Sequence, residues 1–205
     1  MVEFVPLGEL ATIYQGLITS GRGEGARPGP LRVKIATVGD IQDDILSLVR
    51  SETRNLRLTE KTERQLLQPY DVLVSARSTL VKAALVPISF HGLIADSTLL
   101  VVRGREPVFG PYLWWFLTSD FGRQQLKARA TGSVLLSLSP PALKDLQVPL
   151  PPLEQQHRIY DLVRYSEQAY EKAIEAANLR RTLFRDQIIQ ELLRTAEDAG
   201  ERERE

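Results

Sequence analysis

The last quarter of the chain constrains the fold more than any other part of the sequence. After Pro152 the 205-residue chain contains no further proline, and no glycine occurs before Gly200. The two residues that most oppose helix formation are therefore missing from a long stretch. We expect one long α-helix within residues 151–205, with about 40 residues spanning about 60 Å. The charged tail from Glu201 onward is expected to fray.

This helix should carry one apolar stripe. Apolar and small residues recur at spacings of three, four or seven, and a mean period of roughly 3.7 residues keeps them on one side of the helix. A helix of this length cannot bury such a stripe on itself. It either packs against a partner helix as a coiled coil or folds back over its own domain, and the periodicity favours the partner. The expected contact residues are Ile159, Val163, Tyr170, Ala173, Ala177, Phe184 and Ile188.

The part before this helix has a different composition, with short apolar runs interrupted by Gly, Pro, Ser and Asp. Short β-branched runs predict strands at residues 31–38, 71–75 and 99–102. Amphipathic patterns predict helices at residues 59–67 and 111–127, and a segment rich in Gly and Pro at residues 22–30 predicts a loop. The sequence therefore predicts an α+β fold, in which a mixed, β-rich domain over residues 1–150 is followed by the long C-terminal helix over residues 151–205.

Composition limits the classes of function. With 43% apolar and 25% charged residues the chain should bury a core. It has no cysteine, which excludes disulfides and a thiolate nucleophile, and which fits a cytoplasmic location. No secretory signal or bilayer-length apolar run is visible, so we expect no membrane partner. The net charge is zero, so whole-chain charge gives no indication of nucleic-acid binding.

Motifs of catalysis and metal binding are missing from the sequence. His91 and His157 lie far apart and show no metal-ligand spacing, and we find no G-x-S-x-G, P-loop or G-x-G-x-x-G motif. We therefore expect no enzymatic activity, no cofactor and no metal site.

Two local clusters admit a chemical interpretation but favour a structural one. Asp40, Asp43 and Asp44 could bind a hard cation, but they lack the spacing of a calcium loop, so a turn and capping role is preferred. Ser139-Pro140-Pro141-Ala142 is similar to the Ser/Asn/Asp-Pro-Pro-aromatic motif of amino-methyltransferases. Ala142 stands where the base-stacking aromatic residue is needed, which favours a loop leading into a helical turn and a strand.

Basic residues gather at three places in the β-rich part. Arg22, Arg27, Arg32 and Lys34 lie in or beside the Gly/Pro-rich loop, Arg77 and Lys82 flank Ser78-Thr79, and Arg123, Lys127 and Arg129 follow an aromatic segment. Loops that carry Arg, Ser and Thr can reach phosphates and base edges. Each site alone is better explained by solvated charge, but as a pattern of three loops in one small domain they suggest DNA contact.

The junction before the long helix resembles a known family. The segment from Ser137 to Gln156, and above all its Val148-Pro149-Leu150-Pro151-Pro152-Leu153-Glu154-Gln155-Gln156 core, is similar to the junction between a target recognition domain and a conserved helix in specificity (S) subunits of type I restriction-modification enzymes. Further similarities lie at Pro6–Leu10, Val38–Ile41, Pro69–Arg77 and Ala130–Ser133. The resemblance covers nearly the whole chain.

The resemblance implies a non-catalytic subunit that chooses the DNA sequence for an adenine methyltransferase (M) subunit and, where one exists, a restriction (R) subunit. Typical S subunits carry two recognition domains and two conserved helices, whereas this sequence has one of each. We expect two copies to pair antiparallel through the helices as a homodimer and to read a bipartite inverted repeat. A split heterodimer and an inactive remnant are the alternatives for the physiological form.

Other functions remain open beside this one. A stand-alone DNA-binding module or decoy would use the same domain without a methyltransferase, and an enzyme would need the motifs that are missing. For double-stranded DNA, the expected contact residues are Arg22, Arg27, Lys34, Arg77, Ser78, Lys82 and Ser133.

Overall fold

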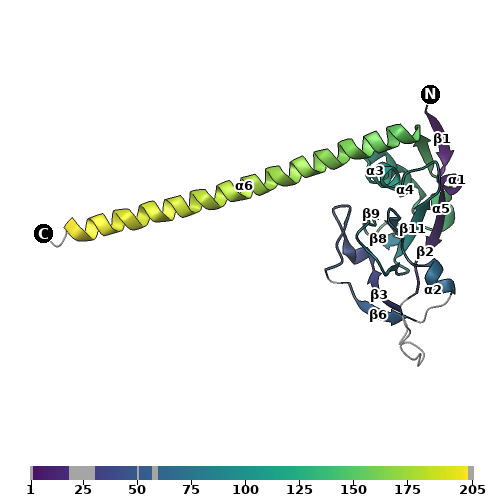
Figure 1. Ribbon diagram of the computed structural model, residues 1–205, viewed down its shortest axis with the longest axis horizontal. Coiled ribbons are helices and arrows are strands. Elements are labelled where there is room, and N and C mark those ends of the chain that lie inside the picture. The colour runs from purple at the N-terminus through teal and green to yellow at the C-terminus, as the bar shows by residue number, and fades with distance from the viewer. Residues whose placement is uncertain (1, 19–30, 50, 57–59, 203–205) are drawn as a thin grey trace. The chain divides into compact units, whose positions relative to one another are not determined.

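The computed structural model of the chain (Figure 1) describes residues 2–18, 31–49, 51–56 and 60–202. It divides into two compact units, Met1–Tyr160 and Asp161–Glu205. The dividing point lies inside the long C-terminal helix. The functional boundary expected after Leu150 stays a prediction.

Short strands and helices make up most of the first unit. Its strands are β1 (Glu3–Pro6), β2 (Ala11–Gln15), β3 (Leu31–Ala36), β4 (Ile41–Gln42), β5 (Ile45–Leu46), β6 (Thr53–Leu56), β7 (Val72–Ser75), β8 (Arg77–Ser78), β9 (Ala83–Leu85), β10 (Leu93–Ala95), β11 (Leu99–Gly104), β12 (Leu136–Ser137) and β13 (Gln147–Leu150). Its helices are α1 (Leu7–Leu10), η1 (Val38–Asp40), α2 (Glu60–Arg64), α3 (Gly110–Thr118), α4 (Asp120–Arg129) and α5 (Pro140–Lys144), and α6 (Leu153–Arg202) begins in this unit.

The central sheet has the strand order β2-β11-β7-β9, and all its pairings are antiparallel. Its middle strands are apolar over Val72–Val74 in β7 and Leu99–Val102 in β11, because both faces of the sheet are buried there. In β11, Leu100 and Val102 pack into one hydrophobic cluster while Leu99 and Val101 pack into another. This is the alternation of a strand between two layers, and it confirms the strands predicted at residues 71–75 and 99–102.

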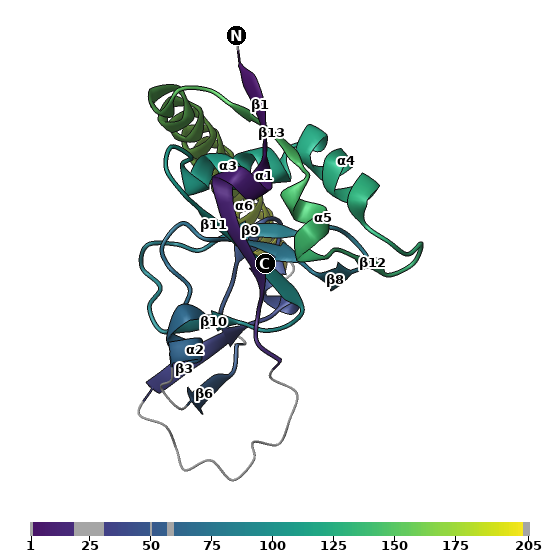
Figure 2. The same ribbon diagram turned by 90° about the vertical axis from the view of Figure 1, so that its right-hand side faces the viewer.

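Helices cover one face of this sheet and further strands cover the other (Figure 2). The first cluster joins the sheet to α1, α3, α4 and α5, with Tyr112, Leu113 and Leu117 among its buried residues. The second cluster joins it to the β4–β5 hairpin and to the β10-β3-β6 sheet, in which β10 and β3 run parallel. The strand predicted at residues 31–38 is present as β3.

The single helix predicted over residues 111–127 is wrong, because the chain forms two helices there. Ser119 is extended, with ψ of 157°, and its side chain caps α4 by accepting a hydrogen bond from the Gly122 backbone at 3.1 Å. A β-carbon on Gly122 would lie 2.0 Å from the Phe116 carbonyl oxygen. The serine cap and the close approach at Gly122 therefore turn the chain between α3 and α4.

Strands β1 and β13 close the first unit by pairing antiparallel, with Glu3 opposite Leu150. The chain then passes through Pro151 and Pro152, and α6 begins at Leu153. Pro152 provides the carbonyl that accepts hydrogen bonds from the backbones of Gln155 and Gln156. The first turns of α6 therefore form on the first unit.

The helix continues through the second unit to Arg202, and its 50 residues correspond to about 75 Å. The fold class expected from the sequence, a β-rich domain followed by a long C-terminal helix, is confirmed. Pairing of this helix as a coiled coil stays a prediction. Within the described part of the chain, no helix is both long and apolar enough to cross a membrane.

Candidate nucleic-acid interface

A hollow of about 600 Å³ opens on the surface of the first unit. Four segments line it: the β4–β5 hairpin, the loop between β8 and β9, helix α4 and the loop before β12. The lining residues are Ile41, Asp43, Asp44, Thr79, Leu80, Val81, Lys82, Arg123, Lys127, Ser133 and Leu136. The hollow therefore gathers polar and aliphatic side chains from segments that are far apart in the sequence.

The β4–β5 hairpin places two aspartates at the hollow. Gln42 pairs with Ile45, and the two residues between them, Asp43 and Asp44, have φ of 47° and 63°. Two-residue hairpin loops favour positive φ at both positions, and aspartate tolerates it better than most residues. These two residues therefore form a turn, as expected from the sequence.

Asp40, the third member of that cluster, acts as a capping residue. Its carboxylate accepts hydrogen bonds from the Thr37 backbone at 2.8 Å and from the Ser51 hydroxyl at 2.9 Å. The turn and capping role is thus confirmed for all three aspartates. Among the described residues, no group of three His, Asp or Glu side chains is placed to hold a metal.

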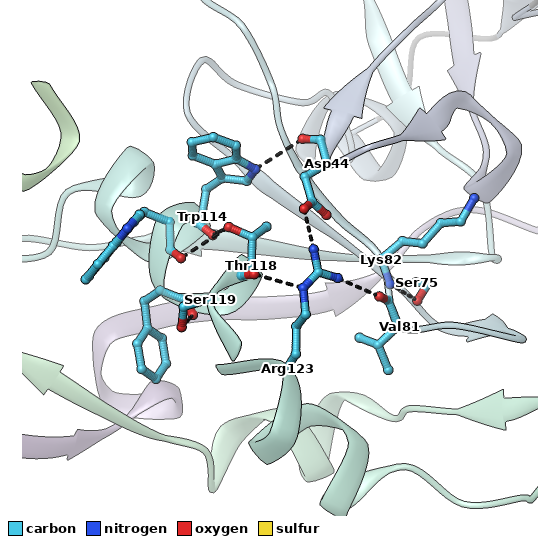
Figure 3. Close-up of polar contacts among 10 residues, drawn as sticks. Asp44, Ser75, Val81, Lys82, Trp114, Thr118, Ser119 and Arg123 are labelled. Carbon is cyan, nitrogen blue, oxygen red and sulfur yellow. Dashed lines mark hydrogen bonds and ion pairs between the residues drawn. The ribbon is translucent and has the colours of Figure 1, made fainter. Parts of the chain in front are cut away.

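Arg123 holds the walls of the hollow together (Figure 3). Its guanidinium forms an ion pair with Asp44 and donates hydrogen bonds to the carbonyl oxygens of Thr118 at 2.8 Å and Val81 at 3.2 Å. The Trp114 indole donates to the Asp44 carbonyl at 3.2 Å. Burial raises the pKa of the Asp44 carboxyl and the nearby Arg123 charge opposes that rise. Arg123 is therefore committed to structure.

Lys82 is also engaged within the protein. Its ammonium group donates to the Ile41 carbonyl oxygen at 2.9 Å, and its backbone N–H donates to the Ser75 hydroxyl at 3.0 Å. These contacts fix the loop between β8 and β9 against the β4–β5 hairpin. Lys82 lines the hollow as a partly buried cation rather than as a freely extended one.

Four of the seven expected DNA contacts gather around this hollow. Lys82 and Ser133 line it, and Arg77 and Ser78 form β8, which is followed directly by the lining residue Thr79. Arg77 is exposed, and the Ser78 hydroxyl accepts a hydrogen bond from the Leu80 backbone at 3.1 Å. The structure therefore brings together residues that lie up to 56 positions apart in the sequence.

The remaining three lie elsewhere or outside the described residues. Lys34 is exposed on β3 in the β10-β3-β6 sheet, where its ammonium group lies 3.5 Å from the Leu48 carbonyl oxygen. Arg22 and Arg27 lie outside the described residues.

Lys127 is among the basic residues that the sequence analysis names, but it is not among the expected DNA contacts. Lys127 follows Arg123 by one helical turn in α4, and both side chains line the hollow. The Ser119 cap and the i, i+4 spacing of these two cations were the available signal.

The segment similar to a methyltransferase motif has a structural role. Ser139 caps α5, with its hydroxyl accepting a hydrogen bond from the Ala142 backbone at 3.4 Å, and Pro140 and Pro141 occupy the first positions of that helix. Prolines suit this place because the first turn needs no backbone donors. The interpretation as a loop leading into a helical turn and then into β13 is confirmed.

Asp71, in the landmark from Pro69 to Arg77, forms the most buried ion pair of the described residues. Its carboxylate, 2% exposed, accepts hydrogen bonds from Arg103 at 2.9 and 2.7 Å. Arg103 also donates to the Leu66 carbonyl oxygen at 2.8 Å and to the Tyr14 hydroxyl at 3.1 Å. Asp71 in this landmark therefore has a structural role, because its ion pair with Arg103 stabilises the first unit.

The fold is that of known restriction-modification chains. A chain from a study of complex assembly and conformational transition of a type I R-M system matches with a TM-score of 0.61 and 19% identity, covering 83% of this chain and 40% of that chain. The HsdS subunit from Thermoanaerobacter tengcongensis matches with a TM-score of 0.55, 21% identity and coverages of 83% and 39%. The type I restriction-modification S subunit from M. genitalium matches with a TM-score of 0.50 and 14% identity, covering 83% of this chain and 41% of that chain. The chain thus spans about 40% of the length of these solved chains.

A family model for the type I restriction modification DNA specificity domain matches residues 2–177. The chain belongs to this family, as its junction sequence suggested. Comparison with curated proteins gives no significant match. The match identifies residues 2–177 as a DNA specificity domain.

Proposed function

We propose that this chain selects the DNA sequence for a type I restriction-modification complex. The family match carries the proposal, because it extends over the first unit and into the helix of the second. The recognition unit would read one half of a bipartite target. The long helix would set the distance to the other half and dock an adenine methyltransferase subunit, which in turn would serve a restriction subunit where one exists.

The hollow and its rim are the proposed DNA-contacting surface. Exposed Arg77 and Lys127 supply cations for phosphates or guanine edges, and Ser133 and Thr79 supply hydroxyl groups. Lys82 adds charge from the wall, while Arg123 and Asp44 keep the surface in shape. Lys34 on β3 remains a proposed contact outside this surface. Arg22 and Arg27, which lie outside the described residues, also remain proposed contacts.

The helix of the second unit supports pairing of two copies. Large apolar side chains lie exposed along it, with Tyr170 64%, Phe184 66% and Ile188 56% exposed. Together with Val163, Ala173 and Ala177 they follow the stripe spacing of a single helix face. Ile159 differs, because it packs at the edge of the first unit's own cluster. The proposed contacts between copies are therefore the stripe residues from Val163 onward.

Charge distribution along this helix favours an antiparallel arrangement. Residues 161–175 contain four acidic and two basic side chains, whereas residues 176–190 contain three basic and one acidic. Antiparallel helices would place each acidic half beside the basic half of the other copy. Two copies in this arrangement would present identical recognition units and select an inverted repeat with a gap.

Mapping methylated adenines across the source genome, with and without this chain, tests the proposal. We expect deletion to abolish methylation at one bipartite, palindromic motif, and expression of the intact chain to restore it. Loss of an asymmetric motif would keep the specificity role but replace the homodimer by a heterodimer. An unchanged methylation pattern would contradict the specificity role and favour a DNA-binding module that acts without a methyltransferase.

A further inference from the structure

Three aliphatic side chains are exposed at the rim of the hollow. Leu80 is 69% exposed in the loop between β8 and β9, and Val134 and Leu135 are 80% and 54% exposed directly before β12. Leu80 lines the hollow together with Ser133 and Leu136. Since β8 and β12 pair antiparallel, with Ser78 opposite Leu136, the two segments leave the pair at the same end. We call Leu80, Val134 and Leu135 the aliphatic rim.

The backbone under the aliphatic rim is fixed by hydrogen bonds. The Leu80 N–H donates to the Ser78 hydroxyl at 3.1 Å. On the other side, Thr131 and Ser137 exchange backbone hydrogen bonds at 2.9 and 2.8 Å, which closes the loop that holds Val134 and Leu135. Gly132 shapes this loop with φ of 94°. The rim is thus a preformed apolar surface, and its exposure is not explained by packing within the unit.

The surroundings of the rim indicate which partner it fits. Lys127, Thr79 and Ser133 line the hollow together with Leu80, and Arg77 is exposed on β8, two residues before Thr79. Lysine and serine are depleted in the cores of protein interfaces, whereas DNA recognition combines cations, hydroxyl groups and small apolar contacts in one surface. These charges favour DNA over an apolar protein partner.

We infer that the aliphatic rim contacts the 5-methyl groups of thymines in the major groove. Among the groups that base pairs present in that groove, the thymine methyl is the apolar one. Burying it against Leu80, Val134 or Leu135 would distinguish thymine from cytosine at that position. The inference rests on the proposed function and adds thymine recognition to it.

Deoxyuridine provides the test, since it pairs like thymine but lacks the methyl group. The intact chain is first used to enrich binding sequences from a random duplex pool. Duplexes with the enriched motif are then made with each thymine replaced singly by deoxyuridine. We expect at least one position where the replacement weakens binding by about fourfold, the effect of burying one methyl group.

A triple variant, Leu80→Ala with Val134→Ala and Leu135→Ala, should bind the thymine duplex more weakly and lose its discrimination against deoxyuridine. Ile88→Ala is the matched control, because Ile88 is 64% exposed but does not line the hollow. It should discriminate like the unmodified chain. Circular dichroism of all variants checks that the fold is retained.

The possible outcomes separate the inference from the proposed function. An enriched motif without deoxyuridine sensitivity would overturn thymine recognition and leave the specificity role intact. Equal discrimination between thymine and deoxyuridine by the triple variant and the unmodified chain would also overturn it. So would a triple variant that binds DNA normally but loses a co-purifying protein, which would assign the aliphatic rim to a protein contact. Absence of any enriched motif would contradict both.

Discussion

The side chain of Gln156 accepts a hydrogen bond from the backbone N–H of Phe109 at 2.8 Å, although 47 positions separate them in the chain. The same side chain donates to the carbonyl oxygens of Pro107 at 3.1 Å and Pro151 at 2.9 Å, and it is completely buried. Beside it, the rings of His157 and Phe109 stack at 4.1 Å. The junction motif therefore fastens the first turns of α6 to the loop before α3.

Replacing Gln156 by leucine should destabilise the first unit by about 3 kcal/mol, because three buried backbone groups would lose their partner. Urea denaturation followed by tryptophan fluorescence measures this change. Gln155→Leu is the control, since Gln155 is the exposed neighbour on the same helical turn, and it should change stability by less than about 0.5 kcal/mol. Equal unfolding midpoints for the two variants would show that the Gln156 contacts contribute nothing.

The ion pair between Asp71 and Arg103 should be needed for folding. Asp71→Asn leaves the Arg103 guanidinium partly buried without its carboxylate, and we expect a loss of about 3–5 kcal/mol. Glu52→Gln provides the comparison, because it removes the exposed pair with Arg54 and should cost less than about 1 kcal/mol. The prediction fails if thermal unfolding gives the two variants similar midpoints.

Stability should fall as the pH rises from 10 to 12. Burial raises the pKa of both Tyr14 and Tyr112 to about 12. Between their usual pKa and the raised one, these tyrosines ionise in the unfolded chain first, so alkaline solution favours unfolding. Tyr112→Phe should flatten this slope. At neutral pH the same variant should lose about 1 kcal/mol, because the Tyr112 hydroxyl donates to the Pro149 carbonyl oxygen. Urea midpoints at pH 7, 10 and 11 measure how stability depends on pH in both proteins. The same pH dependence in Tyr112→Phe and the unmodified chain would contradict the prediction.

A charge in the helix stripe should separate the proposed pair of copies. Ala177→Glu places two carboxylates between closely packed helices, and light scattering should then give the mass of one chain, 23.1 kDa. Gln168→Glu adds the same charge on the opposite face of the helix and should keep the mass of two chains. An unchanged mass for Ala177→Glu would exclude pairing through this stripe.

Arg77 should contribute to DNA affinity directly, because it is exposed beside the hollow. Arg77→Ala is expected to weaken binding to the target duplex by about 1–3 kcal/mol if it contacts a guanine edge. Arg77→Lys keeps the charge and would restore affinity only if the contact is to phosphate. Duplex-shift titrations at two salt concentrations separate these cases, and affinity equal to that of the unmodified chain would remove Arg77 from the interface.

The sequence by itself determined the elements whose signal is local. Proline and glycine are absent after Pro152, so α6 could be predicted without knowledge of any partner. The β-branched runs at residues 71–75 and 99–102 predicted the strands β7 and β11. The junction motif and its landmarks were sufficient for the family. These features depend on backbone propensity and spacing over a few residues, which the linear chain contains.

The tertiary structure alone decided how distant residues combine. It split the segment at Ser119, because the close approach at Gly122 is a contact between two helices. It joined Asp44, Val81 and Arg123 into the wall of one hollow, drew Lys82 into that wall, and buried Gln156 against a loop 47 positions away. Such contacts depend on loop closure and side-chain packing over long sequence separations, and no local pattern of residues specifies them.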